Sequence, residues 1–493
     1  MAEEYFKKAL SLSRDIGHSL REFQCLLGLT VLKVSQFDLE EAFSFLFQTI
    51  QIFDTLRGSL KENDQLKTSL LETHGTFPYK LLSSLLSSKA KPYDALYVEE
   101  LRRARGLADL MGARYSIVEQ ISGDPKSWYG IQNIVAKETD CACLYISVGE
   151  KDMRYWILKT TGAIIFSDEE VSLDKNLVTG LVPDLDEFFT ESFRSLGILP
   201  AQNCEDRSLD DTESMSLYHE NQALLRDCDD KAEIIIVPDS CMYQVPFAAL
   251  TDDEGKFVSE TFRLRIVPSL ATLKLIQDSP PYYHSQTGAL IVGDPQVGEV
   301  IYKGRRKNIT RLTCARKEAE MIGRLLGVTP LIGDRATKQA VLQAIHSVSL
   351  IHLAAHGDAE RGEIVLSPEC PADYVPREEA FLLTMEDISR IKLRAKLVVL
   401  SCCHSARGQI KAEGIIGIVR AFLGSGARSV LAARWAIDDT ATEKFMTCFY
   451  EHLFRGESAS ESLHEARKWM RNNGFVEVSK WASFYADWRQ RDV

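Results

Sequence analysis

The sequence predicts an α/β protein, with a doubly wound parallel sheet that carries helices on both faces and follows an all-α region. Three observations support this fold class. Residues 2–112 have helical periodicity throughout. From Cys141 onward, apolar runs alternate with segments of helical length, as in doubly wound sheets. Two of these runs, 349–353 and 397–400, are rich in β-branched residues, which is typical of buried parallel strands.

The first region, residues 1–115, is predicted to consist of repeated helices. Four residues near the start share one helical face, and four residues 40 positions later have the same spacing. The two sets are Ala2, Phe6, Ala9 and Leu10, and Ala42, Leu46, Thr49 and Ile50. This spacing is typical of the second helix of a tetratricopeptide repeat, although that repeat is normally about 34 residues long. An arbitrary pair of helical hairpins could also produce it. Because a solenoid needs several repeats to bury its core, we expect the region to be the end of a longer array.

The last long helix of this region is predicted at 96–111, with its arginines on a solvated face. Residues 116–285 are expected to form a first α/β half. Its strands are predicted at 142–148 and 154–158, with a turn between them, and at 234–237. The stretch 201–231 is acidic and poor in large apolar residues, so it is predicted to be a flexible loop or linker. A cleavage or docking segment is the alternative for this stretch.

Residues 286–493 are expected to form a second α/β half. Its strands are predicted around Ile291 and at 349–353, 397–400 and 430–433. Helices are predicted to follow at 317–326, 337–346, 413–423, 440–454 and 460–472. Glycines stand where two of these helices should stop, at positions 424 and 426 after the helix 413–423 and at position 456 after the helix 440–454.

Two reactive side chains follow neighbouring strand predictions in this second half. His356 comes directly after the run 349–353, and Cys403 comes after the run 397–400, 47 positions later. Ligands of open α/β sheets bind in the crevice beyond the carboxyl ends of the strands. If the two strands are neighbours, an imidazole and a thiol therefore meet in that crevice. This pairing suits a cysteine nucleophile, because a nearby histidine favours the reactive thiolate.

These motifs also resemble a known family. The segment His352-Leu-Ala-Ala-His356-Gly357 resembles the histidine motif of CHAT domains, which are caspase-like peptidases usually found behind tetratricopeptide repeats. The segment Leu400-Ser-Cys-Cys403-His-Ser405 is similar to their cysteine motif, which usually has alanine where Cys402 stands. Segments 234–239, 245–250, 290–295 and 413–435 resemble further elements in family order. The resemblance implies a caspase-like fold, with a pseudo-caspase half at 116–285 and a catalytic half at 286–493.

The resemblance implies a cysteine endopeptidase that cleaves protein substrates. Cys403 would be the nucleophile and His356 the acid and base, with no obligatory third triad member. The backbone amides of Gly357 and Cys403 would form the oxyanion hole. For this family, a pore-forming (gasdermin-like) protein in cell death or defence is an expected substrate class. The helical repeats would bind a regulatory protein or peptide.

Other interpretations of the same residues remain open. Buried cysteines and histidines are often structural, and Cys402 is expected to pack in the core while His352 lies in or beneath the sheet and His404 lies in a loop. A metal site would use His352, His356, Cys402, Cys403 and His404. Structural zinc ligands are usually separated by two to four residues, whereas 402–404 are adjacent, so no metal or other cofactor is expected. A further alternative is a catalytically idle scaffold that binds partners through its repeats.

The resemblance to caspase-like folds implies that the region beyond the last core strand helps to form the substrate pocket. Trp435, Asp438 and Asp439 lie there, and Asp358 follows the histidine motif. An acidic pocket would attract a lysine or arginine side chain. Alternatively, Asp438 caps the helix that starts near Thr440, and the pocket is apolar.

Composition excludes several classes of protein. The chain has 493 residues and a formal net charge of −12, which argues against a nucleic-acid partner or an anionic membrane surface. No apolar stretch approaches the roughly 20 residues of a membrane span, and the polar start is unlike a signal peptide. The eleven cysteines form no paired framework. Reduced thiols and a cytoplasmic location are therefore expected.

Overall fold

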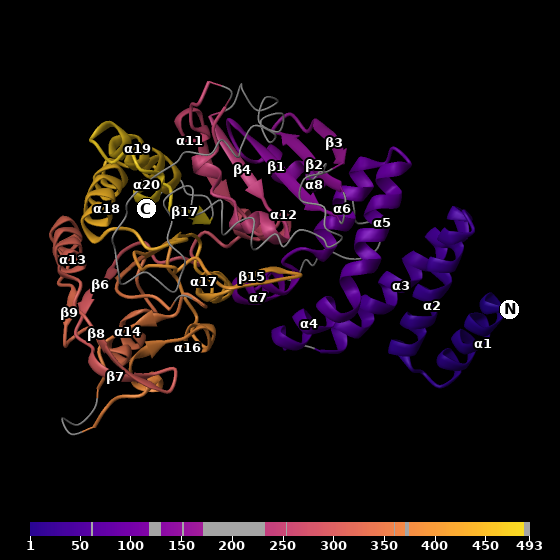
Figure 1. The fold of residues 1–493 in the computed structure, drawn as a ribbon, viewed down its shortest axis with the longest axis horizontal. Helices are drawn as coiled ribbons and strands as arrows, with labels where there is room; N and C mark the ends of the chain where they lie inside the picture. The colour runs from indigo at the N-terminus through magenta and orange to yellow at the C-terminus, as the bar shows by residue number, and fades with distance from the viewer. Residues whose placement is uncertain are drawn as a thin grey trace, which may run out of the picture.

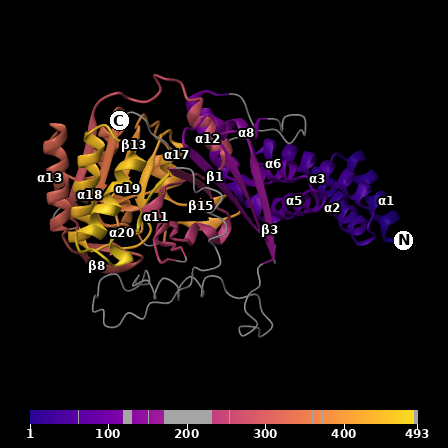
Figure 2. The ribbon, with the colours of Figure 1, turned by 90° about the horizontal axis from the view of Figure 1, so that it is seen from above.

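A computed structural model describes residues 1–60, 63–117, 130–149, 152–170, 232–252, 254–358, 360–369 and 374–487. The predicted acidic loop at 201–231 lies outside the described residues. Antiparallel helices begin the chain, and α1–α3 lie at the end of the molecule farthest from α13 (Figures 1 and 2). A π-helical segment at Leu71–Gly75 continues α4 into α5. The helices of this region are α1 Ala2–Asp15, α2 Ser19–Ser35, α3 Leu39–Ser59, α4 Asp64–Leu70, α5 Thr76–Ser88, α6 Pro92–Arg102 and α7 Arg105–Tyr115.

The predicted repeat face is fully formed in α3 and only in part in α1. Ala42, Leu46, Thr49 and Ile50 are all buried. In α1, Leu10 is buried and Phe6 is half-buried, whereas Ala2 and Ala9 are exposed. The difference follows from packing, because α3 is covered by both α2 and α5.

The predicted single helix over 96–111 is wrong. The chain breaks between α6 and α7, where Ala104 adopts a left-handed φ of 47°. The prediction of a solvated arginine face is also wrong, since Arg102 and Arg103 are both buried. Arg102 donates to both oxygens of Asp239, at 3.2 and 2.7 Å, and to Glu99 at 2.6 Å. A buried ion-pair network therefore joins the helical region to the carboxyl end of strand β4.

Among the described residues, eleven strands form one sheet in the order β3-β2-β1-β4-β5-β17-β16-β13-β10-β6-β9. Strand β2 is antiparallel to both of its neighbours, β1 and β3, and β16 is antiparallel to β17. The other neighbouring strands of this sheet are parallel. The fold class predicted from the sequence is thus confirmed. The strands are β1 Cys141–Val148, β2 Asp152–Lys159, β3 Ile164–Glu170, β4 Glu233–Val237, β5 Arg263–Ile266, β6 Ala289–Pro295, β9 Leu331–Gly333, β10 Leu350–Ala354, β13 Leu397–Leu400, β16 Val430–Ala433 and β17 Phe484–Asp487.

Helices cover both faces of the sheet, and each face has its own core. Odd and even positions along the strands alternate between the two cores, because successive side chains point to opposite faces. Ile351, Val398 and Val430 pack with α17, α12 and α7 on one face, whereas Leu350, Val399 and Leu431 pack with α13, α18 and α19 on the other (Figure 2). The bounds of these helices are α12 Leu270–Gln277, α13 Thr313–Leu326, α17 Ile418–Gly424, α18 Asp439–Phe454 and α19 Ala459–Asn472.

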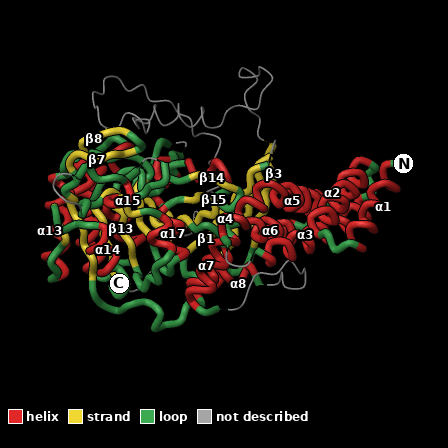
Figure 3. The backbone as a smooth tube through the Cα atoms, turned by 90° about the horizontal axis from the view of Figure 1, so that it is seen from below, coloured by secondary structure: helices red, strands yellow, loops and turns green. Residues whose placement is uncertain are grey.

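The predicted helix at 413–423 is only partly correct. Residues Gly414–Ile416 form strand β15, which pairs with β14 Gln409–Lys411, and the helix begins at Ile418. Two further small sheets are β7 Gly298–Tyr302 with β8 Arg305–Ile309, and β11 Ile364–Val365 with β12 Leu382–Leu383. The β7–β8 hairpin lies at the end of the molecule away from the N-terminal helices (Figure 3). The remaining helices are α8 Ile131–Ala136, α11 Val258–Thr261, α14 Lys338–Ala344, α15 Glu378–Phe381, α16 Met385–Ser389 and α20 Val478–Trp481.

Within the ranges that the structure describes, no helix combines the length and apolarity that crossing a bilayer requires.

Candidate active site

The strands that precede His356 and Cys403 are adjacent and parallel. Leu350 of β10 is opposite Leu397 of β13, and Leu353 is opposite Leu400, an offset of 47 positions. The same offset separates His356 from Cys403. Each residue follows the last paired residue of its strand by three positions, so the histidine and cysteine loops leave the carboxyl edge of the sheet from neighbouring strands.

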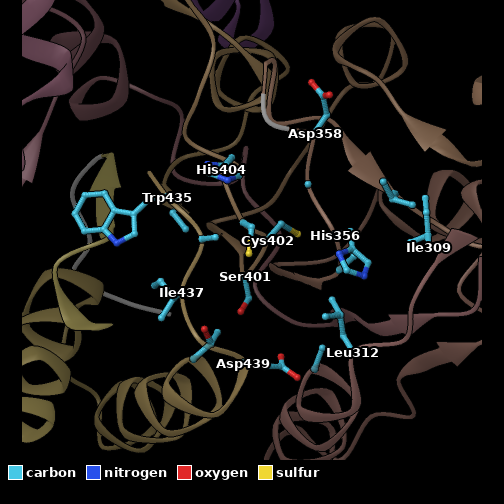
Figure 4. A pocket seen from close by; sticks show the side chains of 18 of the residues that line it. Ile309, Leu312, His356, Asp358, Ser401, Cys402, His404, Trp435, Ile437 and Asp439 are labelled. Atoms are coloured by element: carbon cyan, nitrogen blue, oxygen red, sulfur yellow. The ribbon is translucent and has the colours of Figure 1, made fainter. Parts of the chain in front are cut away.

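Both residues line one cavity with a volume of about 530 Å³. Most of its lining comes from four segments: the hairpin and loop at 302–312, the histidine loop at 355–358, the cysteine loop at 401–404, and the segment 433–442. In Figure 4, Trp435 and Ile437 lie on one side of Cys402 and His356 lies on the other. The cavity is thus at the place where α/β sheets bind ligands.

The imidazole of His356 is oriented by a backbone carbonyl. Its Nε2 lies 2.8 Å from the carbonyl oxygen of Thr310. Because a carbonyl oxygen can only accept, this bond requires a proton on Nε2. In the neutral ring, Nδ1 then carries the lone pair and can accept a proton from a thiol. No sequence pattern pointed to Thr310, since its contribution comes from the main chain.

Gly357 is held in a tight space beside the cysteine loop. A Cβ at this position would lie 2.2 Å from the carbonyl oxygen of Cys403. Gly357 also forms an antiparallel bridge with Ile364 in which the hydrogen bonds come from its neighbours: Val365 donates to the His356 carbonyl and Asp358 donates to the Glu363 carbonyl. In this arrangement the N–H of Gly357 points away from the bridge partner.

The two adjacent cysteines have different surroundings. Cys402 is only 2% exposed, and its thiol donates to the carbonyl oxygen of Leu353 at 3.2 Å. Burial raises the pKa of the Cys402 thiol, which keeps it protonated. Cys403 is half-buried and lines the cavity. This difference favours Cys403 as the reactive thiol, in agreement with the motif.

His352 and His404 both lie in the interior. His352 is fully buried in β10, between the hydroxyl of Tyr450 at 3.0 Å from its Nδ1 and the carboxylate of Glu318 at 2.9 Å from its Nε2. His404 lies in a turn, as predicted, but is buried, and it has a left-handed φ of 60°. Burial, together with nearby Arg407, lowers the pKa of His404 to about 4. Both histidines therefore have structural surroundings, although Glu318 also lines the cavity.

The carboxylate of Asp358 is bonded to its own loop and to the β7–β8 hairpin. It accepts from the N–H groups of Glu360 and Arg361 at 3.0 and 2.9 Å, from the hydroxyl of Tyr302, and from Lys303 at 3.2 Å. Burial raises the pKa of Asp358, but these donors outweigh it and lower the pKa overall. Asp358 borders the cavity, yet these bonds disfavour it as the carboxylate that receives a substrate side chain.

The pocket residues beyond β16 combine two roles. Asp438 is the N-cap of α18 and accepts from the N–H of Ala441 at 3.0 Å. Asp439 accepts from the N–H of Cys314, in the first turn of α13, at 3.2 Å. Both also line the cavity, as does the buried Trp435, whose indole N–H donates to the Ser479 carbonyl at 2.8 Å. The cap alternative is thus present in the structure, and a pocket role for the two aspartates remains a prediction.

In the described part of the chain, no group of three or more histidine, cysteine, aspartate or glutamate side chains converges as metal ligands. Five residues were candidate metal ligands. Of these, Cys402 donates its thiol proton to the Leu353 carbonyl, and the ring of His352 is bonded to the hydroxyl of Tyr450 in α18. These positions do not form one ligand shell.

Comparison with known proteins places this geometry in a family. Residues 216–487 match the family model of the CHAT domain. Tetratricopeptide repeat protein 28 of Mus musculus is 30% identical over 291 residues, and the Homo sapiens protein is 30% identical over 292 residues. Each match covers 51% of this chain, and the chain spans only 12% of the length of either relative.

Among solved structures, the chain is similar in fold to separase in two crystal structures of the Saccharomyces cerevisiae separase–securin complex. Both have a TM-score of 0.51, with 12% and 11% sequence identity. They cover 92% and 91% of this chain and 38% and 37% of the separase chain. This likeness shows a caspase-like fold. Because the matched family model covers more than half of the sequence, the chain belongs to the CHAT domain family.

Proposed function

We propose that this protein is a cysteine endopeptidase, with Cys403 as the nucleophile and His356 as the general base and acid. The observation that supports the proposal is that β10 and β13 are adjacent and parallel, so that His356 and Cys403 follow neighbouring strands and line one cavity. The bond from His356 to the Thr310 carbonyl adds support, because it leaves Nδ1 as the basic nitrogen.

In the proposed reaction, His356 Nδ1 takes the thiol proton of Cys403, and the thiolate attacks the carbonyl carbon of the scissile amide. The imidazolium then gives this proton to the leaving amine, while the acyl group stays on Cys403. A water molecule, deprotonated by His356, attacks the thioester. This step releases the carboxylic acid and restores the thiol.

The negative oxygen that develops on the substrate needs hydrogen-bond donors. We assign this role to the backbone N–H groups of Gly357 and Cys403. The non-hydrogen-bonded position of Gly357 in its bridge supports the first assignment, because its N–H is directed away from Ile364. Such donors are a large part of catalysis in acyl transfer.

The proposal extends to cellular context by family resemblance. The activity would be intracellular and cytoplasmic, the helical region would bind a regulatory protein or peptide, and a pore-forming (gasdermin-like) protein in cell death is a suitable substrate class. The similar solved structures hold separase in complex with securin, which supports a search for a protein partner.

The experiment uses a thiol-reactive probe together with a protein cleavage assay. Wild-type protein should label at Cys403 and cleave substrate, and Cys403→Ala should lose both. Cys402→Ala is the matched control and should retain most activity, because Cys402 is a small buried residue beside the site. His356→Ala should abolish labelling as well as cleavage.

Two outcomes would contradict the proposal. Loss of activity in Cys402→Ala with retention in Cys403→Ala would show that the nucleophile is wrong. A Cys403 that stays inert toward the probe, alone and with bound partner, would instead support the idle scaffold.

A further inference from the structure

A basic hairpin forms one wall of the candidate active site. Residues 298–311, which include β7 and β8, contain five basic side chains and one acidic side chain, whereas the whole chain has a net charge of −12. The hairpin is therefore a positively charged surface on an acidic protein. Its charged residues are Lys303, Arg305, Arg306, Lys307 and Arg311, against Glu299.

The hairpin is fixed relative to the catalytic loops. Val300 is buried in a small apolar cluster with Val365 and Phe381. The N–H of Ile301 donates to the carbonyl of Pro376 at 2.8 Å. The hairpin's own continuation supplies the Thr310 carbonyl that orients His356. The basic side chains are thus carried by a framework with a set position beside the dyad.

Arg305 and Lys307 belong to the face of the hairpin that borders the cavity. Lys307 and Ile309 line the cavity, and alternate residues of a strand share one face, so Arg305 continues this row. Tyr302, which also lines the cavity, is the cross-strand partner of Arg305. Both Arg305 and Lys307 are exposed.

Four of the five basic residues of the hairpin have partners within it or beside it, and the Lys307 ammonium lies over the Tyr302 ring, 5.9 Å from its centroid. Lys303 pairs with Asp358 at 3.2 Å and with Glu360 at 2.8 Å, and Arg311 pairs with the buried carboxylate of Asp294 at 2.5 Å. Arg306 forms an exposed pair with Glu299 at 3.1 Å. Arg305 forms no ion pair with any residue that the structure describes.

The opposite wall has the opposite character. It contains Trp435, Ile437 and Phe484, followed in the chain by the lining residues Asp438 and Asp439, and Asp439 lies below Ile437 in Figure 4. A peptide that crosses the cavity therefore meets the exposed Arg305 and Lys307 on the hairpin side, where Asp358 is already bonded to Tyr302 and Lys303, and the carboxylates of Asp438 and Asp439 elsewhere in the lining. An acidic side chain would be attracted to the hairpin and repelled from the 438–439 side.

We propose that the β7–β8 hairpin selects protein substrates with an aspartate or glutamate side chain on one flank of the scissile bond, with Arg305 and Lys307 as the residues that recognise it. Arginine suits this role because its guanidinium binds a carboxylate with two parallel hydrogen bonds. The inference rests on the proposed peptidase function and adds a substrate class to it.

The test compares wild type with the charge reversal Arg305→Glu/Lys307→Glu on a peptide library read by mass spectrometry. Wild type should favour Asp or Glu at one or two positions near the cleaved bond. For a preferred peptide, the reversal should lower kcat/KM by about tenfold, which is about 1.4 kcal/mol. It should raise kcat/KM for the same peptide with Lys in place of Glu.

A matched control carries the same change in net charge far from the hairpin, as Lys8→Glu/Arg324→Glu, and should keep the wild-type preference. Both control residues are exposed, on α1 and α13. Binding is measured separately in a Cys403→Ala background, with a fluorescent Glu/Gly decapeptide at low and high salt. The hairpin reversal should abolish this binding, and high salt should weaken it.

The outcomes separate the two proposals. Cleavage that depends on Cys403 but shows no acidic preference, or a preference unchanged by the reversal, overturns the hairpin inference and leaves the peptidase intact. If the protein cleaves no peptide but binds the acidic peptide through the hairpin, the peptidase proposal is wrong and the hairpin is still a recognition surface for acidic peptides. Absence of hairpin-dependent binding and of acidic preference together overturns the inference.

Discussion

Gly357 directly follows His356 and lies against the cysteine loop, and the absence of a side chain there is a steric requirement. A Cβ would stand 2.2 Å from the Cys403 carbonyl oxygen, a backbone atom that cannot move away as a side chain could. Its own φ lies outside the left-handed region, so the requirement comes from close approach and not from the turn.

We expect Gly357→Ala to displace the cysteine loop, to destabilise the protein by about 1–3 kcal/mol, and to slow probe labelling of Cys403. Urea unfolding and labelling rates measure the two effects. Gly58→Ala, in an exposed turn of α3 where a Cβ meets nothing within 4 Å, is the control and should be neutral or slightly stabilising. Equal behaviour of the two variants would refute the steric argument.

His404 gives the second prediction at this scale. Its pKa is lowered to about 4 by burial and by Arg407, against about 6.5 in an unfolded chain. Between pH 6.5 and 4, the imidazole of His404 binds a proton in the unfolded state but stays neutral in the folded state. The stability linked to His404 is therefore complete above pH 6.5 and is lost as the pH falls toward 4.

His404→Asn should flatten this dependence while keeping the left-handed backbone, which asparagine tolerates. Between pH 7 and 4.5, wild type should lose about 2 kcal/mol more unfolding free energy than the variant. Denaturant titrations at both pH values measure the difference. His284, whose pKa is also lowered to about 4 by burial, contributes equally to both proteins and cancels. The exposed His346→Asn controls for the exchange itself, and parallel pH profiles for wild type and His404→Asn would contradict the assignment.

At the scale of elements, α18 shows how one residue can serve both structure and specificity. Asp438 caps the helix by accepting from Ala441, and the helix packs Phe445 and Phe449 into the core on that face. Loss of the cap would disturb the start of α18, and this helix start contributes Asp438, Asp439 and Thr442 to the cavity lining.

Asp438→Ala should lower the free energy of unfolding by about 1 kcal/mol, since four N–H groups at the helix start need acceptors. Asp438→Asn keeps the cap and removes the charge, so its stability should match wild type. Any change of cleavage preference in Asp438→Asn alone would then report on the pocket. Thermal and urea unfolding provide the check, and an unchanged stability in Asp438→Ala would remove the capping role.

The strands and helices around the site could be predicted from the sequence because their periods are strong and local. The motif also separated Cys402 from Cys403, and burial accounts for the difference: both line the cavity, but Cys402 is only 2% exposed and its thiol is bonded to the Leu353 carbonyl. Thr310 and the hairpin wall could not be found, because a carbonyl has no residue signal and a basic run resembles any solvated turn. The helical prediction for β15 was wrong, since Glu413–Ile416 carries no strand-length pattern.

The buried arginines of α6 were missed for a related reason. A charged side chain enters the core only when a partner meets it there, and the partner of Arg102, Asp239, is 137 positions away. Local pattern holds no information on that pairing. Burial of such a pair is costly unless hydrogen bonds offset it, and Arg102 makes three hydrogen bonds to Glu99 and Asp239, while its Nε has no partner among the described residues.

For the whole molecule, the helical region and the sheet are not separable at residue 115. Glu100 accepts from the N–H groups of Leu270 and Ala271 at the start of α12, and α6 and α7 share a core with the sheet. Glu413, ten residues beyond Cys403, accepts from the N–H of Gly106 at 2.9 Å and pairs with Arg420 at 3.1 Å. A partner bound to the helices, as proposed, would therefore have a physical route to the cysteine loop.

Deletion of residues 1–112 should therefore abolish cooperative unfolding, because it removes core helices and leaves Asp239 without Arg102. Deletion of residues 1–35, which removes α1 and α2 only, should keep cooperative unfolding and allow a clean test of regulation through Cys403 labelling. Calorimetry of both truncated proteins supplies the measurement. If the longer deletion unfolded cooperatively at the wild-type temperature, the shared core would be irrelevant to stability.

The position of β17 bears on the order in which the molecule assembles. This strand joins the two halves of the sheet, with β16 on one side and β5 on the other, and its pairing with β5 links positions about 220 residues apart. Contacts of such long sequence separation form slowly, since a large loop must close first. During synthesis, the halves can therefore condense separately but cannot become one sheet until β17 has left the ribosome. Maturation of the cavity, which includes Phe484 of β17, is tied to that late step.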